Sequence, residues 1–251
     1  MGASVSFDFT DHVVLVTGGT KGVGRGIGAA FADAGATVAV IARSEVDDLP
    51  AGWLFESADL RDGDAAAEAV DRIVERAGRL DTVVNNAGGA PPADTATASP
   101  RFTARVIDLN LLSAMHVSQR ANHHLQTAGG SIVNISSVTA LRPAPTVAAY
   151  GAAKAGLLNY TLTVGQEWAP KVRVNAVTAG LIFTEQSELH YGGAESVATI
   201  EADIPMRRMA RPSDIANTCM FLASPAAAYL TGANIVIDGG GDVPMFLRNR
   251  D

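Results

Sequence analysis

The stretch VVLVTGGTKGVG, residues 13–24, decides the fold of this 251-residue chain. Residues 13–16 form an apolar run that predicts a buried strand, and the glycines at positions 18, 22 and 24 allow a tight turn into a helix. The start of such a helix offers unpaired backbone N–H groups and a positive dipole end to a phosphate. The order of strand, glycine turn and helix therefore predicts a nucleotide-binding βαβ unit.

Six more apolar runs follow this stretch, and longer helical segments separate most of them. The expected strands cover residues 37–42, 54–57, 82–85, 131–135, 172–177 and 234–237, and the expected helices cover 24–34, 64–77, 101–125, 149–168 and 212–222. Strands this apolar are covered on both faces, as in parallel sheets. The alternation predicts an α/β fold, a doubly wound, Rossmann-like parallel sheet of about seven strands with helices on both faces. Residues 44–52 are too few for a full crossover helix, so we expect a loop or one helical turn there.

Composition and charge narrow the class of protein. The 19 basic and 26 acidic residues give a net charge of -7, which argues against a nucleic-acid partner because phosphate contacts need a basic field. Although 47% of residues are hydrophobic, no apolar run approaches the roughly 18 residues of a membrane-spanning helix, and no leader peptide is expected. A lone cysteine and five scattered histidines predict neither a disulfide nor a metal site. We expect a cytoplasmic protein with one domain over residues 1–251.

Several further motifs follow the glycine turn in a fixed order. Asn85-Asn86-Ala87-Gly88 comes after the fourth expected strand, Asn110 lies in the next helix, and Ser137 ends the fifth strand. Tyr150 follows Ser137 by thirteen residues, and Lys154 comes four residues later. In this order the motifs resemble the short-chain dehydrogenase/reductase family, in its single-domain branch of about 250 residues with TGxxxGxG and YxxxK motifs. The resemblance extends from Val13 to Gly240.

Tyr150 and Lys154 share one face of the expected helix because they are four residues apart. A lysine ammonium one turn away, together with a positive nicotinamide ring, is expected to lower the pKa of the phenol so that it can act as general acid or base. By resemblance, Ser137 stabilises the charge on the substrate oxygen, and Asn110 holds a water of a proton relay through Lys154. The expected catalytic residues are therefore Asn110, Ser137, Tyr150 and Lys154.

The end of the second strand bears on which dinucleotide binds. NAD-dependent Rossmann proteins carry an acidic residue there, whereas this chain has Ala42 followed by Arg43. A guanidinium matches the geometry of a 2′-phosphate, and Lys21 adds a second cation, so we expect NADP(H) to be preferred over NAD(H). The full set of expected cofactor-binding residues, most of them implied by the resemblance, is Gly18, Thr20, Lys21, Gly22, Val23, Gly24, Arg43, Asp59, Leu60, Asn86, Ala87, Gly88, Tyr150, Lys154, Gly180, Ile182 and Thr184.

The substrate end of the site is expected in residues 183–209, which the resemblance identifies as a substrate lid. The family usually has Pro-Gly before this segment, where this chain has Ala179-Gly180, so the turn is less rigid. Gly192 and Gly193 suit a mobile segment. Four side chains either shape an apolar substrate pocket or pack the lid against the core: Leu141, Phe183, Leu189 and Tyr191.

Together these features predict an NADP(H)-dependent oxidoreductase that interconverts a secondary alcohol and its ketone. The substrate is either a 3-oxoacyl thioester or a smaller carbonyl compound, and scattered arginines do not decide between them. Enoyl reduction is disfavoured because that branch resembles a Tyr-x6-Lys spacing. A different class, a non-catalytic dinucleotide-binding sensor, would have lost the catalytic residues, which are intact here. The resemblance also implies a homotetramer in which helices 101–125 and 149–168 form one interface.

Overall fold

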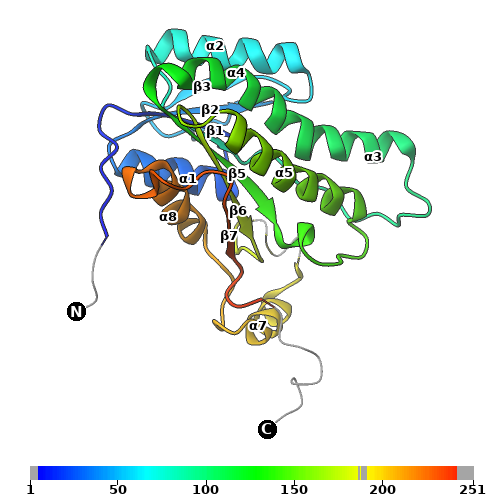
Figure 1. Ribbon diagram of the computed structural model, residues 1–251. Helices are drawn as coiled ribbons and strands as arrows, with labels where there is room; N and C mark the ends of the chain where they lie inside the picture. Colours follow the sequence, from blue (N-terminus) through cyan, green and yellow to red (C-terminus); the bar gives the residue numbers. More distant parts are fainter. Residues whose placement is uncertain (1–4, 186, 188–190, 242–251) are drawn as a thin grey trace.

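The computed structural model describes residues 5–185, 187 and 191–241, and a parallel β-sheet forms its centre (Figure 1). Within these residues the sheet has seven strands in the order β3-β2-β1-β4-β5-β6-β7, every neighbouring pair parallel. The strands are β1 (Val13–Thr17), β2 (Thr37–Ala42), β3 (Leu54–Ser57), β4 (Thr82–Asn85), β5 (Ser131–Ser137), β6 (Arg173–Ala179) and β7 (Asn234–Ile237). The chain winds outward in both directions from β1, which confirms the predicted doubly wound sheet.

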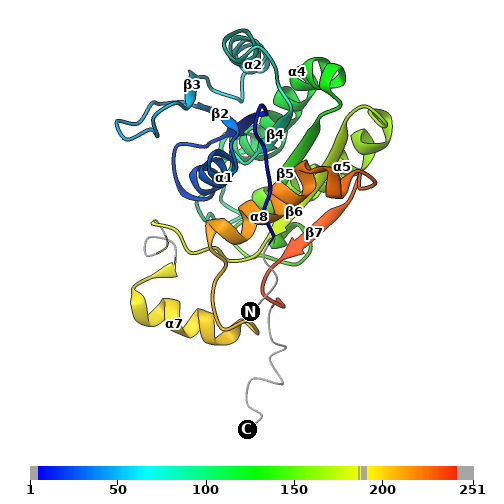
Figure 2. The same ribbon diagram turned by 90° about the vertical axis from the view of Figure 1, so that its left-hand side faces the viewer.

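Helices cover both faces of this sheet (Figure 2). The α-helices of the described residues are α1 (Gly22–Asp33), α2 (Gly63–Ala77), α3 (Pro100–Ile107), α4 (Ser113–Ala128), α5 (Ala148–Glu167), α7 (Ala194–Asp203) and α8 (Pro212–Ala223), of which α7 lies apart from the two faces. On one face, α1 and α8 bury apolar side chains such as Phe31 and Ile215 against the strands. On the other face, α2, α4 and α5 do the same with side chains such as Ile73 and Leu125. This two-sided cover explains why the strand sequences are almost wholly apolar.

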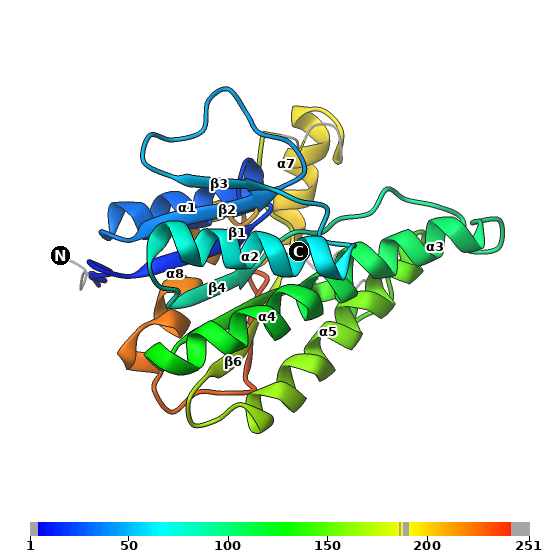
Figure 3. The same cartoon turned by 90° about the horizontal axis from the view of Figure 1, so that it is seen from above.

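Two helical segments differ from the sequence expectation. The single helix expected over 101–125 is divided, because a π-helical turn at Asp108–Leu112 separates α3 from α4. Figure 3 shows α3 and α4 following one another with α5 beside them. The segment expected to be a mobile insertion contains a further helix, α7, which lies beyond the carboxyl ends of the strands (Figure 1). A 3.6-residue pattern reveals neither an inserted π-turn nor a short helix that leaves most of its side chains exposed.

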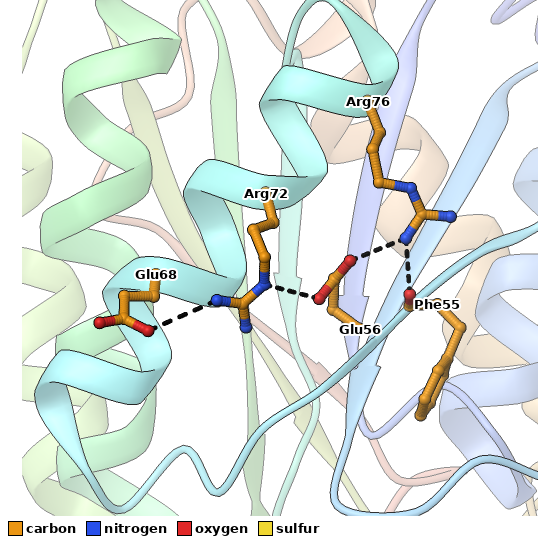
Figure 4. A network of polar contacts seen from close by, with 5 residues as sticks. All are labelled: Phe55, Glu56, Glu68, Arg72 and Arg76. Atoms are coloured by element: carbon orange, nitrogen blue, oxygen red, sulfur yellow. Dashed lines mark hydrogen bonds and ion pairs between the residues drawn. The ribbon is translucent and has the colours of Figure 1, made fainter.

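The edge strand β3 is held to α2 by a small ionic network (Figure 4). Glu56 accepts hydrogen bonds from Arg72 Nε at 2.8 Å and from an Arg76 guanidinium nitrogen at 2.7 Å. Partial burial raises the pKa of Glu56, but the two guanidiniums outweigh it and hold that pKa below its usual range. The preceding connection, residues 44–52, contains no helix, in agreement with the sequence expectation. The network therefore anchors the sheet edge from which Arg43 and Asp59 emerge.

Candidate functional site

The carboxyl ends of the strands border a cleft of about 1120 Å³, at the place where the winding of the sheet reverses. All of the expected cofactor-binding residues line it, from Gly18 in the glycine turn to Thr184 after β6. Ser137, Tyr150 and Lys154 line the same cleft. The fold therefore brings the expected dinucleotide-binding residues and three of the four expected catalytic residues to one continuous cavity, whose volume is ample for an organic cofactor.

The glycine turn depends on residues without side chains, for reasons that differ from one position to the next. Gly18 and Gly22 have φ values of +65° and +54°, in the left-handed region that favours glycine. A Cβ atom added to Gly24 would collide with the backbone oxygen of Gly18 and with the side-chain nitrogen of Asn86. The start of α1 therefore borders the cleft with glycines at positions 22 and 24, as the approach of a pyrophosphate to its backbone N–H groups requires.

The NNAG motif holds this turn from the neighbouring strand. Thr17 Oγ1 accepts hydrogen bonds from the backbone N–H groups of Asn86 and Ala87, both at 3.0 Å. In return, Asn86 Nδ2 donates to the backbone oxygen of Thr17 at 3.0 Å. Asn85 points into the core instead, where its Nδ2 donates to Asn134 Oδ1 at 2.8 Å and so ties β4 to β5. The motif therefore braces the sheet and fixes the glycine turn.

The far end of the cleft carries the two expected cations. Lys21 and Arg43 are both exposed and both line the cleft. Asp59, one of the expected cofactor-binding residues, is bonded by Arg61, whose Nε donates to Asp59 Oδ1 at 2.8 Å. That hydrogen bond is the main reason why the pKa of Asp59 is lowered, and the charge of Arg43 adds to the effect. The carboxylate is therefore ionised and fixed in orientation, as an acceptor should be.

Tyr150 and Lys154 lie in the first turns of α5, with Ser137 at the end of β5 beside them. Lys154 is 3% exposed, and its Nζ donates to the backbone oxygen of Ile135 at 2.8 Å. The ammonium is 5.8 Å from the centroid of the Tyr150 ring. Burial lowers the pKa of Lys154 to about 8. The geometry thus combines a phenol, a hydroxyl and a buried cation at one wall of the cleft.

The protein's own groups raise the pKa of Tyr150. Burial raises it above the usual value, and hydrogen bonding with Ser137 offsets the effect only in part. In the protein alone these groups therefore favour the neutral phenol, because the desolvation of the ring outweighs its hydrogen bond with Ser137. A neutral phenol can donate a proton, which is the form that the reduction of a carbonyl requires.

Asn110 lies behind the cleft, in the π-helical turn, and is 1% exposed. Its Oδ1 accepts from the backbone N–H of Gly89 at 2.7 Å, and its Nδ2 donates to the backbone oxygens of Gly89 and Val106 at 3.1 and 2.9 Å. A Cβ atom on Gly88 would lie 2.7 Å from Asn110 Oδ1 and 3.3 Å from Lys154 Nζ. Asn110 therefore joins the π-turn to the loop that packs against Lys154.

The expected substrate residues do not all reach the cleft. Tyr191 lines it, whereas Leu141 and Phe183 are about half exposed and lie outside its lining. The backbone of Phe183 donates to Ala210 at 2.8 Å, in a segment whose bridge pairs Ile182 with Ala210. Leu189 lies outside the described residues. The lining also includes Thr139 and Arg142, which follow Ser137 closely in the sequence but belong to no motif that would single them out.

Neither a metal cluster nor a membrane span is found in the part of the chain that the structure describes. No group of three or more His, Cys, Asp or Glu side chains there is arranged to hold a metal ion. No helix among the described residues combines the length and the apolar character needed to cross a membrane. His124 instead bonds Asp71 at 2.9 Å on the surface of α2 and α4.

Comparison with known proteins adds independent evidence to this geometry. A family model described as enoyl-(acyl carrier protein) reductase matches residues 18–242. The chain belongs to the short-chain dehydrogenase/reductase family. An uncharacterised oxidoreductase of Mycobacterium tuberculosis is 37% identical to it over 249 residues, covering 95% of each chain. A 3-oxoacyl-[acyl-carrier-protein] reductase of Thermotoga maritima is 35% identical, over 91% of this chain and 96% of the relative.

A solved structure of a family member has the same architecture. The ligand-free aldohexose dehydrogenase of Thermoplasma acidophilum aligns with a TM-score of 0.87 and 30% identity, over 92% of this short-chain dehydrogenase/reductase and 94% of that chain. The relatives' names span a thioester substrate and a sugar, so family membership does not select a substrate. It does make the protein an oxidoreductase that uses a nicotinamide dinucleotide.

Proposed function

We propose that this family member is an NADP(H)-dependent oxidoreductase that interconverts a secondary alcohol and its ketone, with Tyr150 as the general acid and base. The observation that carries the proposal is the position of the Tyr150 phenol. It lines the same cleft as the glycine turn, hydrogen-bonded with Ser137 and one turn from the buried Lys154 ammonium. That arrangement supports the transfer of a proton to or from a substrate oxygen held in the cleft.

Each residue has a separate task in this proposal. When bound, the nicotinamide supplies or accepts the hydride. Ser137 donates to the substrate oxygen and stabilises the charge that develops there. Tyr150 gives its proton to that oxygen in reduction and takes it back in oxidation. Lys154 stabilises the transient phenolate, and Asn110 acts as a positioning residue through the loop beside Lys154.

The proton-transfer role of Tyr150 is tested by Tyr150→Phe. The substitution removes the only atom of the side chain that exchanges a proton and keeps the ring that lines the cleft. We expect turnover to be lost while the affinity for NADPH stays unchanged, as measured by steady-state kinetics and by fluorescence titration. Ser137→Ala serves as a comparison, since it should lower turnover without abolishing the proton donor. Full activity of Tyr150→Phe would refute the assignment.

The cofactor-binding residues named from the sequence are proposed in those roles, with Lys21 and Arg43 as receptors of a 2′-phosphate. Both residues line the cleft, the charge of Arg43 acts on Asp59, and position 42, the family's acidic position, is alanine. Loss of the Arg43 guanidinium should remove most of the preference for NADPH over NADH, because the 2′-phosphate loses its bidentate partner. We expect NADPH to bind at least about tenfold tighter than NADH to the wild type, which is roughly 1.4 kcal/mol, and Arg43→Ala to remove most of that ratio. Equal affinities in the wild type, measured by titration, would contradict the preference.

A 3-oxoacyl thioester is the second candidate substrate, and the Thermotoga maritima relative favours it. The family model carries the name of an enoyl reductase, but the four-residue separation of Tyr150 and Lys154 favours reduction of a carbonyl. We propose that residues 183–209 cover the substrate within one domain over residues 1–251. The described part of that segment contributes Tyr191 to the cleft. A cytoplasmic location stays a prediction from the sequence.

The protein is further proposed to form a homotetramer through the helices expected at residues 101–125 and 149–168. Leu162 supports this arrangement, because it is an apolar side chain of α5 that is 49% exposed in the isolated chain. Light scattering at micromolar concentration should give roughly four times the chain mass of 25.9 kDa. A monomer under these conditions would contradict the proposed assembly.

A further inference from the structure

A carboxylate from the segment that follows β6 contacts the glycine turn. Glu185 Oε1 accepts a hydrogen bond from the backbone N–H of Gly22 at 2.8 Å, across 163 residues of sequence. Gly22 is the first residue of α1. Its N–H group is one of the donors that the turn offers to a pyrophosphate, and Gly22 itself lines the cleft. An anionic side chain thus occupies part of the place where an anionic ligand is expected.

The start of α1 has no cap of its own. Lys21 is the N-cap residue and makes no side-chain cap hydrogen bond, and the first turn of the helix contains no acidic residue. Helix starts are normally satisfied by a nearby oxygen acceptor, and a negative charge there is favoured by the helix dipole. Glu185 supplies both the acceptor and the charge from another segment. Its interaction with Gly22 N–H is charge-assisted and stronger than a neutral hydrogen bond.

A compact turn holds Glu185 in this position. Ser187, which is 1% exposed, accepts from the backbone N–H of Thr184 at 2.7 Å through its hydroxyl oxygen. The backbone N–H of Ser187 donates to the oxygen of Thr184 at 3.0 Å. Upstream, Phe183 and Leu181 are bonded to Ala210. The position of Glu185 is therefore supported by the hydrogen bonds of Thr184 and Ser187 and by the pairing of Phe183 and Leu181 with Ala210.

We propose that Glu185 is an internal competitor of the dinucleotide pyrophosphate, and this inference rests on the proposed cofactor function. In the free protein the carboxylate caps α1. When the cofactor binds, its pyrophosphate takes the N–H donors of the glycine turn, and Glu185 must leave because two anions cannot share them. Glu185 thereby lowers the affinity for the dinucleotide. Its release couples cofactor binding to the turn that carries Thr184, next to the substrate end of the cleft.

Ligand fragments and a charge-neutral variant test this competition. Glu185→Gln keeps the size of the side chain and one oxygen acceptor but removes the charge. We expect it to bind 2′-phospho-ADP-ribose, which contains the pyrophosphate, about fivefold tighter than the wild type does, as a neutral bond replaces a charge-assisted one. The affinity for adenosine 2′-monophosphate, which lacks the pyrophosphate, should stay unchanged. Calorimetric titration measures both, and Glu195→Gln, an exposed glutamate in the first turn of α7, is the matched control.

The outcomes separate this inference from the proposed function. If wild type and Glu185→Gln bind 2′-phospho-ADP-ribose equally, the competition is refuted while the cofactor role stands. Equal gains for both fragments, or the same gain in Glu195→Gln, would also refute it, since they indicate a general effect of charge. If the wild type binds neither NADPH nor NADH, both the proposed function and the inference fall. Glu185→Ala removes the acceptor altogether and should bind the pyrophosphate fragment at least as tightly as Glu185→Gln.

Discussion

Lys154 is a buried cation whose ammonium donates to a backbone carbonyl, that of Ile135, instead of to a carboxylate. Burial of a charge without an opposite charge costs stability, which is why its pKa falls from 10.5 to about 8. The fold thus carries a destabilising residue at the site where we propose that it stabilises the phenolate of Tyr150. Such a cost is typical of residues kept for function rather than for stability.

The sign of this cost predicts a pH dependence of stability. Below pH 8 Lys154 is protonated in both the folded and the unfolded chain, so the full cost of burying its charge applies. Between pH 8 and about 10 the unfolded chain binds more protons than the folded chain, so the free energy of unfolding rises with pH. Lys154→Met removes the penalty and should be more stable than the wild type at pH 7, by up to about 3 kcal/mol. Urea unfolding at pH 7, 8.5 and 9.5 should show that difference shrinking as pH rises. A constant difference would contradict the account.

Among single residues, the sequence predicts the members of the site well where the chemistry requires both a residue type and a spacing. Tyr150, Lys154 and Ser137 do meet in the cleft, and Arg43 does lie on its border. The contact of Glu185 with Gly22 could not be predicted, because no spacing rule links positions 163 residues apart. The rise that burial causes in the pKa of Tyr150 in the protein alone could not be predicted, since the degree of burial is known only from the packed fold.

At the scale of elements, the glycine turn and the NNAG loop form one unit. The turn can follow its path only because Gly24 lacks a side chain and because Thr17 receives two backbone N–H groups from Asn86 and Ala87. The strand bounds were close to the predicted ones, because apolar runs bounded by turn residues mark buried strands clearly. The π-turn around Asn110 and the helix α7 were missed, because both interrupt or lack a regular apolar period.

A pair of glycine substitutions tests the tight contact at this turn. Gly24→Ala places a methyl group against the Gly18 carbonyl and the Asn86 amide, neither of which can move freely. We expect a loss of roughly 1–3 kcal/mol in the free energy of unfolding and weaker NADPH binding. Gly193→Ala is the matched control, because its added Cβ meets no atom within 4 Å, so stability should stay nearly unchanged. Thermal unfolding of both variants measures the difference. Unchanged stability of Gly24→Ala would contradict the close contact of position 24 with Gly18 and Asn86.

At the scale of the whole molecule, one sheet places all the parts of the site. The glycine turn follows β1, the NNAG loop follows β4, Ser137 ends β5, and the segment with Thr184 follows β6. Parallel strands with adjacent carboxyl ends therefore assemble one cleft from segments spread over most of the chain. The net charge of -7 is no obstacle to phosphate binding, since Lys21 and Arg43 act locally at the border of the cleft.

In the proposed function, this cleft reduces ketones and oxidises secondary alcohols through Tyr150. The most direct measurement is the change in NADPH absorbance when the purified protein meets a panel of ketones, including 3-oxoacyl thioesters, sugars and small hydrophobic carbonyls. If Tyr150 is the general acid and base, the wild type oxidises NADPH with at least one of these ketones. Tyr150→Phe then oxidises none, although it binds the cofactor equally well. A flat trace across the panel despite tight NADPH binding would contradict the account and indicate a dinucleotide sensor.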